Sequence, residues 1–365
     1  MTSSLNAHAR LDEDAIRNIP KAEVHVHLEG CFELADLLEL SKAADVPLPG
    51  PARSLFDIST HTDREIPAVT TGGKTKGIGA GGLSGFLRFL DWECGLVRTT
   101  EQAARHAYRF AARESSSGVR YADAIINPTH WGAWRGRLPA LFDAFAKGLA
   151  EAEQDGLASV NLCPSILRAQ TQQEAVELVE WILEDRPDRV VGLSIDGDEK
   201  AAGRTGPRFA EAYTRARDGG LRRTVHAGES SGPEGVWDAI RYLHAERIDH
   251  GVRAIEDPEL VAYLADSEIS LGVCPLSNMH LGLWNDLSEH PLAALREAGV
   301  RVTINTDDPA AQGMRLESEW AVCAATFGWG LADMRDFART SIAACFAPEE
   351  LKAALRAELD PVTAG

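Results

Sequence analysis

Short apolar segments alternate with longer amphipathic segments along the chain, and this alternation constrains the fold more than any other feature. Eight apolar runs of strand length occur at residues 23–28, 119–126, 158–167, 189–196, 222–227, 246–250, 269–275 and 301–306. Segments with helical periodicity lie between them, for example 170–185, 232–245 and 257–267. Strands that alternate with helices favour a parallel sheet, and eight repeats predict an α/β fold of the (β/α)8 TIM barrel type rather than a doubly wound sheet.

The length of 365 residues fits one barrel domain over residues 1–365, because single α/β barrels run from about 200 to more than 400 residues. A long insertion between the first and second predicted strands contains the glycine-rich segment 70–86. Gly73, Lys74 and Thr75 match the end of a phosphate-binding loop, but Ala68 stands where that loop needs its first glycine. We interpret the segment as a connection over one end of the barrel, either a lid or a disordered loop.

Charge and composition exclude several classes of partner. The net charge of −18 repels phosphate backbones, so nucleic acid is not an expected partner. The chain has neither an apolar signal segment at its start nor a later run of about 18 apolar residues, so we expect no membrane partner. The six cysteines are far apart without a C-x-x-C pair, which disfavours disulfides and a thiolate zinc site. We expect a cytoplasmic protein with a small-molecule substrate and leave its oligomeric state open.

Polar residues gather at the carboxyl ends of the predicted strands. They are His25, His27 and Glu29 on the first strand, Asp196 and Gly197 on the fourth, His226 and Glu229 on the fifth, His250 on the sixth, and Asp307 and Asp308 on the eighth. A lone strand-end histidine such as His226 or His250 is more typical of a structural hydrogen bond, and the TDDP segment at Asp307 and Asp308 is more typical of a turn or helix cap. In barrels of this class, however, that end carries the active site, so their joint occurrence there favours a functional site.

Two histidines in one strand indicate part of a metal site. His25 and His27 point to the same face because side chains alternate along a strand. A catalytic zinc needs nitrogen or oxygen ligands and one open position for water. His226 and Asp307 could complete the ligand set, leaving other strand-end residues to orient or deprotonate the water. The fourth strand has no lysine before Lys200 that could bridge two metals after carboxylation, so we expect one Zn²⁺ per chain.

Six motifs resemble those of the adenosine deaminase family, the adenosine and adenine deaminase branch of the amidohydrolase superfamily. They are PKAEVHVHLEG (20–30), GDE (197–199), VHAGES (225–230), AERIDHGVRAIEDPEL (245–260), CPLSN (274–278) and VTINTDDPA (302–310). The resemblance covers nearly the whole chain. It implies a mononuclear zinc enzyme that replaces the exocyclic amine of an adenine ring with oxygen and releases ammonia.

The resemblance also implies roles for individual residues. The four matching zinc ligands are His25, His27, His226 and Asp307. His250 matches the residue that activates or orients the hydrolytic water, and Glu229 matches the acid that protonates ring N1, a role that needs a neutral carboxyl. Asp308 matches a group that contacts the water and N7, and the Gly197 N–H matches a donor to N3. Together with these last two, His27 and Glu29 are expected to contact the substrate.

The motifs conflict over the substrate. Glu29 stands where adenosine enzymes have aspartate, and with segments 247–253 and 274–278 it resembles enzymes acting on free adenine. Segments 196–199, 232–240 and 254–260 resemble the adenosine enzymes more closely. We predict deamination of adenosine or 2′-deoxyadenosine to the inosine form, with adenine, or a modified nucleoside such as aminodeoxyfutalosine, as alternatives.

Two further alternatives belong to other functional classes. A catalytically inactive nucleoside-binding barrel is disfavoured because it would not need Glu229, His250 and Asp308 beside a full ligand set. A hydrolase of cyclic amides is disfavoured by the missing bridging lysine. His130 and His280, which follow the second and seventh strands, either contact substrate or serve the structure.

Overall fold

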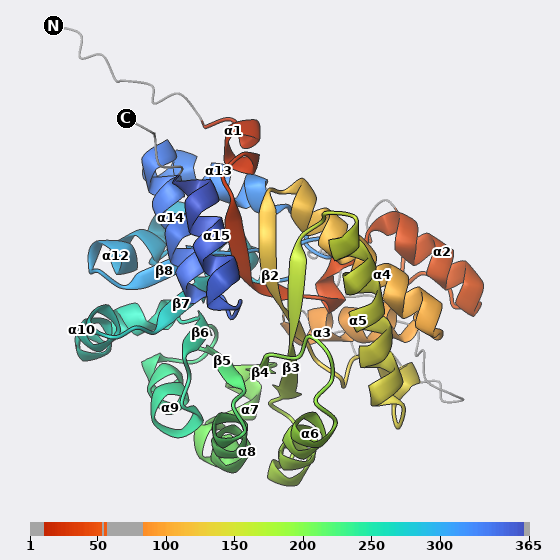
Figure 1. Ribbon diagram of the computed structural model, residues 1–365. Coiled ribbons are helices and arrows are strands. Elements are labelled where there is room, and N and C mark those ends of the chain that lie inside the picture. Colours follow the sequence, from red (N-terminus) through yellow and green to blue (C-terminus); the bar gives the residue numbers. More distant parts are fainter. Residues whose placement is uncertain (1–10, 53–54, 57–82, 361–365) are drawn as a thin grey trace, which may run out of the picture.

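The sheet is built from eight parallel strands in chain order. The computed structural model describes residues 11–52, 55–56 and 83–360 (Figure 1). Each strand pairs with the next along the chain. The strands are β1 (Lys21–His27), β2 (Val119–Ile126), β3 (Ser159–Leu167), β4 (Gly192–Asp196), β5 (Arg222–Ala227), β6 (Arg247–His250), β7 (Ser270–Val273) and β8 (Arg301–Ile304). A parallel bridge between Val26 and Asp307 joins the end of the chain's last strand to β1, so the barrel is nearly closed and the prediction of a (β/α)8 fold is confirmed.

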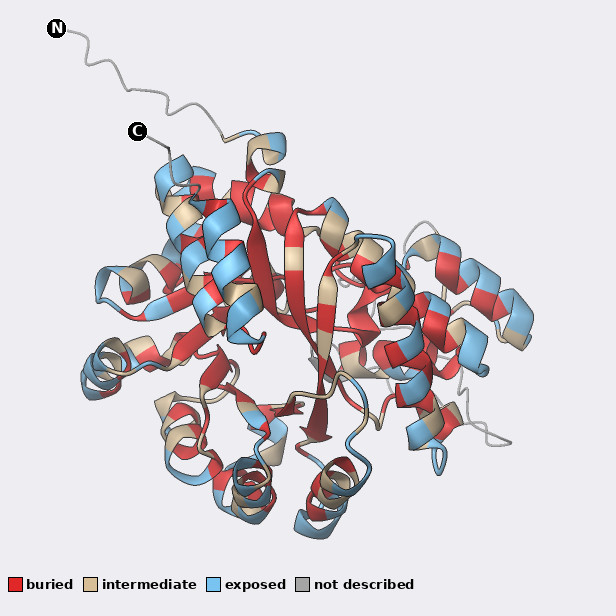
Figure 2. Ribbon diagram, viewed as in Figure 1, coloured by how far each residue is buried: buried red, intermediate tan, exposed pale blue. Residues whose placement is uncertain are grey.

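Helices follow the strands and cover the outside of the barrel. They are α1 (Glu13–Arg17), α2 (Leu34–Ala44), α3 (Leu83–Gly95), α4 (Thr100–Ser116), α5 (Leu138–Gln154), α6 (Gln172–Asp185), α7 (Glu199–Ala202), α8 (Gly206–Asp218), α9 (Pro233–Leu243), α10 (Pro258–Asp266), α11 (Pro275–His280), α12 (Leu292–Glu297), α13 (Leu316–Phe327), α14 (Leu331–Ala344) and α15 (Glu349–Leu359). Exposed residues lie on their outer faces, whereas the strands are mostly buried (Figure 2).

Local signals in the sequence place several helix starts. α6 begins after Thr171, whose side chain accepts a hydrogen bond from the N–H of Glu174, and this capping satisfies an otherwise unpaired donor. Pro233 and Pro258 stand in the first turns of α9 and α10, where proline fits because no N–H is needed. These three helices match the predicted segments within two residues.

Strand β1 shows how the core and the site are separated. All seven of its residues are buried. Val24 and Val26 belong to the apolar core, and His25 and His27 alternate with them on the opposite face, toward the barrel interior. One strand therefore serves both the core and the polar interior.

Three other expectations concern the glycine-rich segment, the cysteines and membrane-spanning helices. Residues 57–82, which hold most of the glycine-rich segment 70–86, lie outside the described residues, so the lid or loop interpretation stays a prediction. The six cysteines are all buried and free, as expected. Within the described part of the chain, none of the helices combines the length and the apolar character needed to cross a membrane.

Candidate active site

Four predicted ligand residues converge at the carboxyl end of the strands. The Nε2 atom of His226 lies 3.1 Å from Nε2 of His25 and 3.0 Å from Nε2 of His27. The Oδ1 atom of Asp307 lies 3.3 Å from Nε2 of His25 and 3.5 Å from Nε2 of His27. All four side chains are buried, and their ligand atoms lie within 4.8 Å of one another. We call these four residues the donor cluster.

Backbone pairing between β1 and the end of β8 brings Asp307 to the histidines. The N–H of Asp307 donates to the carbonyl oxygen of His25, and the N–H of His27 donates to that of Asp307. Asp307 adopts a φ of 66°, in the left-handed region that aspartate tolerates better than most residues. The hydroxyl of Ser277 donates to Oδ2 of Asp307 at 2.7 Å, which leaves Oδ1 turned to the histidines.

In His25 and His226, the ring nitrogen outside the donor cluster, Nδ1, faces an acceptor. Nδ1 of His25 lies 2.7 Å from the carbonyl oxygen of Gly272, and Nδ1 of His226 lies 3.5 Å from Oδ2 of Asp249. A proton on Nδ1 leaves the lone pair on Nε2, the atom that points into the donor cluster. Burial lowers the pKa of His226 well below its usual value, which favours the neutral ring. Three imidazole nitrogens and a carboxylate so arranged fit a divalent metal ion such as zinc.

Glu229 and His250 lie beside the donor cluster. Nε2 of His250 is 3.5 Å from Oε1 of Glu229 and 4.0 Å from Oδ2 of Asp307. The Nδ2 group of Asn278 lies 3.4 Å from Nδ1 of His250, a contact that favours the tautomer with its proton on Nε2. Burial, followed by the charges of Asp307 and Glu199, raises the pKa of Glu229 well above its usual value. This shift favours the protonated form of the carboxyl, which is the form that could donate a proton.

Asp308 is packed directly against the loop that follows β1. A Cβ atom built on Gly30 would lie 2.4 Å from Cβ of Asp308, so only glycine fits at position 30. Burial, together with the charge of Asp307, raises the pKa of Asp308 well above its usual value. Its Oδ1 lies against Gly30 and is buried without a hydrogen-bond partner among the described residues.

A cavity of about 40 Å³ is lined by three residues of the donor cluster, His27, His226 and Asp307, and by Glu229, His250 and Asp308. Gly197 and His130 also line it, and Phe86 on α3 contributes an apolar side. Glu29 is fully buried rather than on this wall, and its Oε1 accepts from the backbone N–H of Asn127 at 2.6 Å and from Nε1 of Trp131 at 2.9 Å. His280 is exposed at the end of α11 and does not line the cavity.

The structure adds residues to which the sequence analysis assigned no role. Asp249 faces the ring of His226, Ser277 holds Asp307, and Asn278 orients His250. The last two lie in the quoted motif CPLSN, so their position in a motif was the available signal. Asp249 also lies in a quoted motif, AERIDHGVRAIEDPEL, but nothing in its spacing indicates that it would face His226.

Comparisons with known proteins agree with this geometry. A family model described as adenosine deaminase matches residues 20–362. An adenine deaminase of Cupriavidus pinatubonensis is 36% identical over 349 residues, which cover 95% of this chain and 93% of that protein. An adenosine deaminase of Serratia proteamaculans is 34% identical over 340 residues, which cover 93% of this chain and 97% of that protein.

Two solved structures share the fold at a TM-score of 0.82. An adenine deaminase from Arthrobacter aurescens is 28% identical, with 93% of this chain and 98% of that chain covered. An amidohydrolase from Burkholderia ambifaria with bound Zn is 27% identical, with 98% and 94% covered. The chain therefore belongs to the adenosine deaminase family, as a hydrolytic deaminase of the amidohydrolase superfamily that acts on adenine or adenosine-type substrates.

Proposed function

We propose that this barrel is a zinc-dependent enzyme that deaminates adenosine or 2′-deoxyadenosine to inosine or 2′-deoxyinosine and ammonia. One observation carries the proposal: the buried carboxyl of Glu229, with its raised pKa, lies 3.5 Å from His250 and beside the donor cluster. Attack at C6 breaks the aromaticity of the purine ring, so a proton must reach ring N1 as the nucleophile adds. A neutral carboxyl supplies that proton.

The donor cluster would hold the zinc ion. When bound there, zinc supplies Lewis acidity that makes water nucleophilic near neutral pH. His250 presents its Nε2–H toward the nucleophile and orients it. Glu229 donates to N1, Asp308 contacts the nucleophile and N7, and the N–H of Gly197 donates to N3.

The choice of a nucleoside rests on segments 196–199, 232–240 and 254–260, which resemble adenosine enzymes. Free adenine is a second candidate, favoured by two observations on Glu29. It is longer than the aspartate typical of adenosine enzymes, and it is held fully buried by Asn127 and Trp131.

Ammonia release by zinc-loaded protein tests the proposal, with adenosine, 2′-deoxyadenosine and adenine supplied side by side and metal-free protein as the control. Turnover of the nucleosides supports it, and Glu29→Asp should then keep nucleoside turnover. Turnover of adenine alone would replace it with the second candidate. Binding of adenosine without ammonia release from any of the three would contradict both, and would leave a modified nucleoside as substrate or an inactive nucleoside-binding barrel.

A further inference from the structure

The carboxylate of Glu199 accepts hydrogen bonds from four consecutive backbone amides that follow β5. Its Oε2 accepts from the N–H groups of Glu229 at 2.8 Å, Ser230 at 3.1 Å and Ser231 at 3.3 Å. Its Oε1 accepts from the N–H of Gly228 at 3.0 Å and from the hydroxyl of Ser231 at 2.8 Å. One buried side chain thus pairs the polar backbone of residues 228–231.

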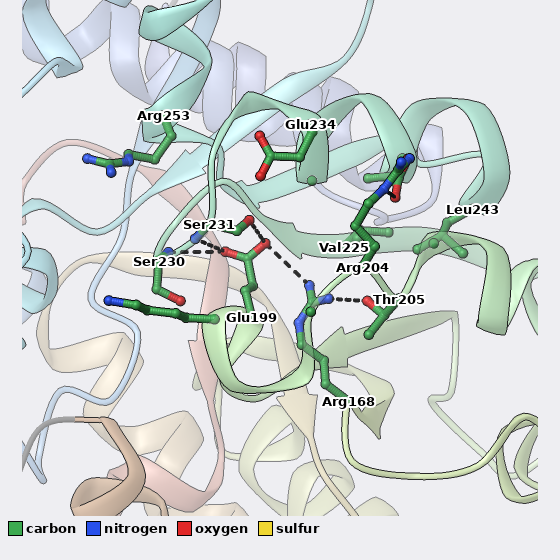
Figure 3. Close-up of a pocket in the computed structure, with 16 residues that line it drawn as sticks. Arg168, Glu199, Arg204, Thr205, Val225, Ser230, Ser231, Glu234, Leu243 and Arg253 are labelled. Carbon is green, nitrogen blue, oxygen red and sulfur yellow. Dashed lines mark hydrogen bonds and ion pairs between the residues drawn. The ribbon is translucent and has the colours of Figure 1, made fainter.

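Arg168 binds a backbone carbonyl group at the end of the same strand, β5. Its Nη2 donates to the carbonyl oxygen of His226, and its Nη1 donates to the hydroxyl of Thr205. Nη2 also lies 3.8 Å from Oε1 of Glu199, and both side chains are buried (Figure 3). We call Glu199 and Arg168 the clasp, because together they hold the backbone from residue 226 to residue 231.

Residues 228–231 lie between β5 and α9, so regular secondary structure does not fix their backbone conformation. The chain leaves β5 at Gly228 with a φ of 66°, and α9 begins only at Pro233. Successive N–H groups in such a turn point to one side and form a concave binding place for an anion, which the Glu199 carboxylate occupies. A Cβ built on Gly235 would lie 3.0 Å from Oε1 of Glu199, so the first turn of α9 also packs on the carboxylate.

Glu199 lies on the far side of this segment from the reacting groups. It lines a separate cavity of about 390 Å³, together with Ser230 and Ser231 (Figure 3), whereas Glu229 lines the active-site cavity. Glu199 is therefore placed to act through the backbone of the segment, in addition to the effect of its charge on the pKa of Glu229, and not by touching substrate.

We propose that Glu199 is a positioning residue for the deamination, which fixes the backbone of residues 228–231 so that the carboxyl of Glu229 meets ring N1. The inference rests on the proposed function, because it concerns the residue that we assign as the proton donor there. A displacement of about 1 Å in a reacting group can cost on the order of 10² in rate, so loss of the clasp carboxylate should be visible in kcat.

The test uses zinc-loaded full-length protein carrying Glu199→Gln. The amide keeps the volume of the side chain but offers one acceptor oxygen and turns an NH₂ group toward backbone donors. We expect kcat to fall by about 10²-fold, while KM and the zinc content stay at the wild-type level. Glu199→Asp, which keeps the charge one methylene further back, should recover part of kcat.

Asp238→Asn is the matched control. Asp238 is a buried carboxylate that lines the same 390 Å³ cavity, but its partner is Arg204 rather than the 228–231 backbone. This variant should lose thermal stability and keep kcat. A fall in kcat equal to that of Glu199→Gln would mean that any buried charge lost in this region has the same effect, and it would overturn the inference.

A double-mutant cycle with Glu229→Gln separates positioning from general stabilisation. Once Glu229 cannot donate a proton, its position should no longer matter, so Glu199→Gln should lower kcat little in that background. An equal fall in both backgrounds, or a change confined to KM or zinc content, would overturn the inference.

Amide hydrogen exchange adds a readout that does not need turnover. Glu199→Gln should speed exchange in peptides covering residues 226–232 and leave the other strand ends unchanged; unchanged exchange there would overturn the inference. Absence of turnover by the wild-type protein would instead overturn the proposed function, and with it the catalytic role of Glu199. The two failures are therefore distinguishable.

Discussion

The barrel interior contains two clusters of buried polar side chains, and they differ in whether opposite charges are paired. The first is the donor cluster at the carboxyl end of the strands. The second surrounds Arg247 on β6: its Nη1 donates to Oδ2 of Asp123 at 2.7 Å, and its Nε lies 3.5 Å from Oδ1 of Asp249. The guanidinium also lies 4.2 Å from the centre of the Phe346 ring. We call Arg247, Asp123 and their direct partners the arginine layer.

The arginine layer pairs groups of opposite charge, Arg247 and Asp123. Asp123 also accepts from the hydroxyl of Tyr121 at 2.7 Å and from the N–H of Phe346 at 2.9 Å, so its charge is well paired. In the donor cluster, by contrast, electron-pair donors face one another. Buried complementary charges tie elements of the fold together, whereas convergent donors oppose folding unless a cation binds. We therefore expect substitutions in the donor cluster to change activity, and those in the arginine layer to change stability.

The largest effect on activity should come from the donor cluster itself. Asp307→Asn removes a charged metal ligand, and asparagine tolerates the positive φ at this position. Zinc affinity should fall first, and ammonia release should fall to the level of the metal-free protein. Added zinc should no longer raise the melting temperature, because a ligand stabilises only a protein that binds it. Zinc analysis together with calorimetry checks both parts, and retained zinc with full activity would contradict the ligand assignment.

Glu229→Gln should lower kcat by about 10²–10⁴-fold, because the amide cannot donate a proton to N1 while general acid–base groups contribute that much. The zinc content should remain that of the wild type. Steady-state kinetics and metal analysis on the same preparation check this prediction.

The pH profile provides the control for Glu229. Wild-type kcat/KM should fall as pH rises through the raised pKa of Glu229, because the donating form is the protonated one. Glu229→Gln should lack this alkaline limb. An unchanged limb in the variant would assign it to another group.

Gly30→Ala should have an intermediate effect. The new methyl group would occupy the place of Asp308, whose Oδ1 would lie 2.2 Å away, so the aspartate must shift. A shift of about 1 Å would lower kcat/KM by up to roughly 10²-fold, with zinc still bound. A variant with wild-type kinetics would show that the position of Asp308 does not limit the reaction.

The smallest effect on activity should come from the arginine layer. Asp123→Asn leaves the buried Arg247 without its main partner, and breaking a buried pair typically costs about 3–5 kcal/mol of unfolding free energy. Denaturant unfolding should show this loss, while kcat and zinc content per folded molecule stay unchanged. Loss of zinc in this variant would break the comparison, because it would show that the two groups of residues depend on each other.

Sequence patterns were sufficient to predict the barrel and the end at which its site lies. Strand and helix periods are local properties, and the alternation of His25 and His27 with valines in β1 places both rings in the interior without knowledge of any other strand. The strand-end positions of His226 and Asp307 then completed a possible ligand set, and the motif resemblance assigned a role to Glu229. The structure brings these three residues together with the two histidines. The structure of the glycine-rich segment 70–86 remains a prediction.

The sequence by itself determined the chemical groups of the site and the strand ends that carry them. Only the tertiary structure decided which neighbouring residues contact those groups and fix their positions. Asp249 pairs with His226 through the register between β5 and β6, and Glu199 reaches the 228–231 backbone through a turn at Gly228. Such contacts depend on inter-strand register and on loop dihedrals, to which residues distant in the sequence contribute jointly, so no local pattern encodes them.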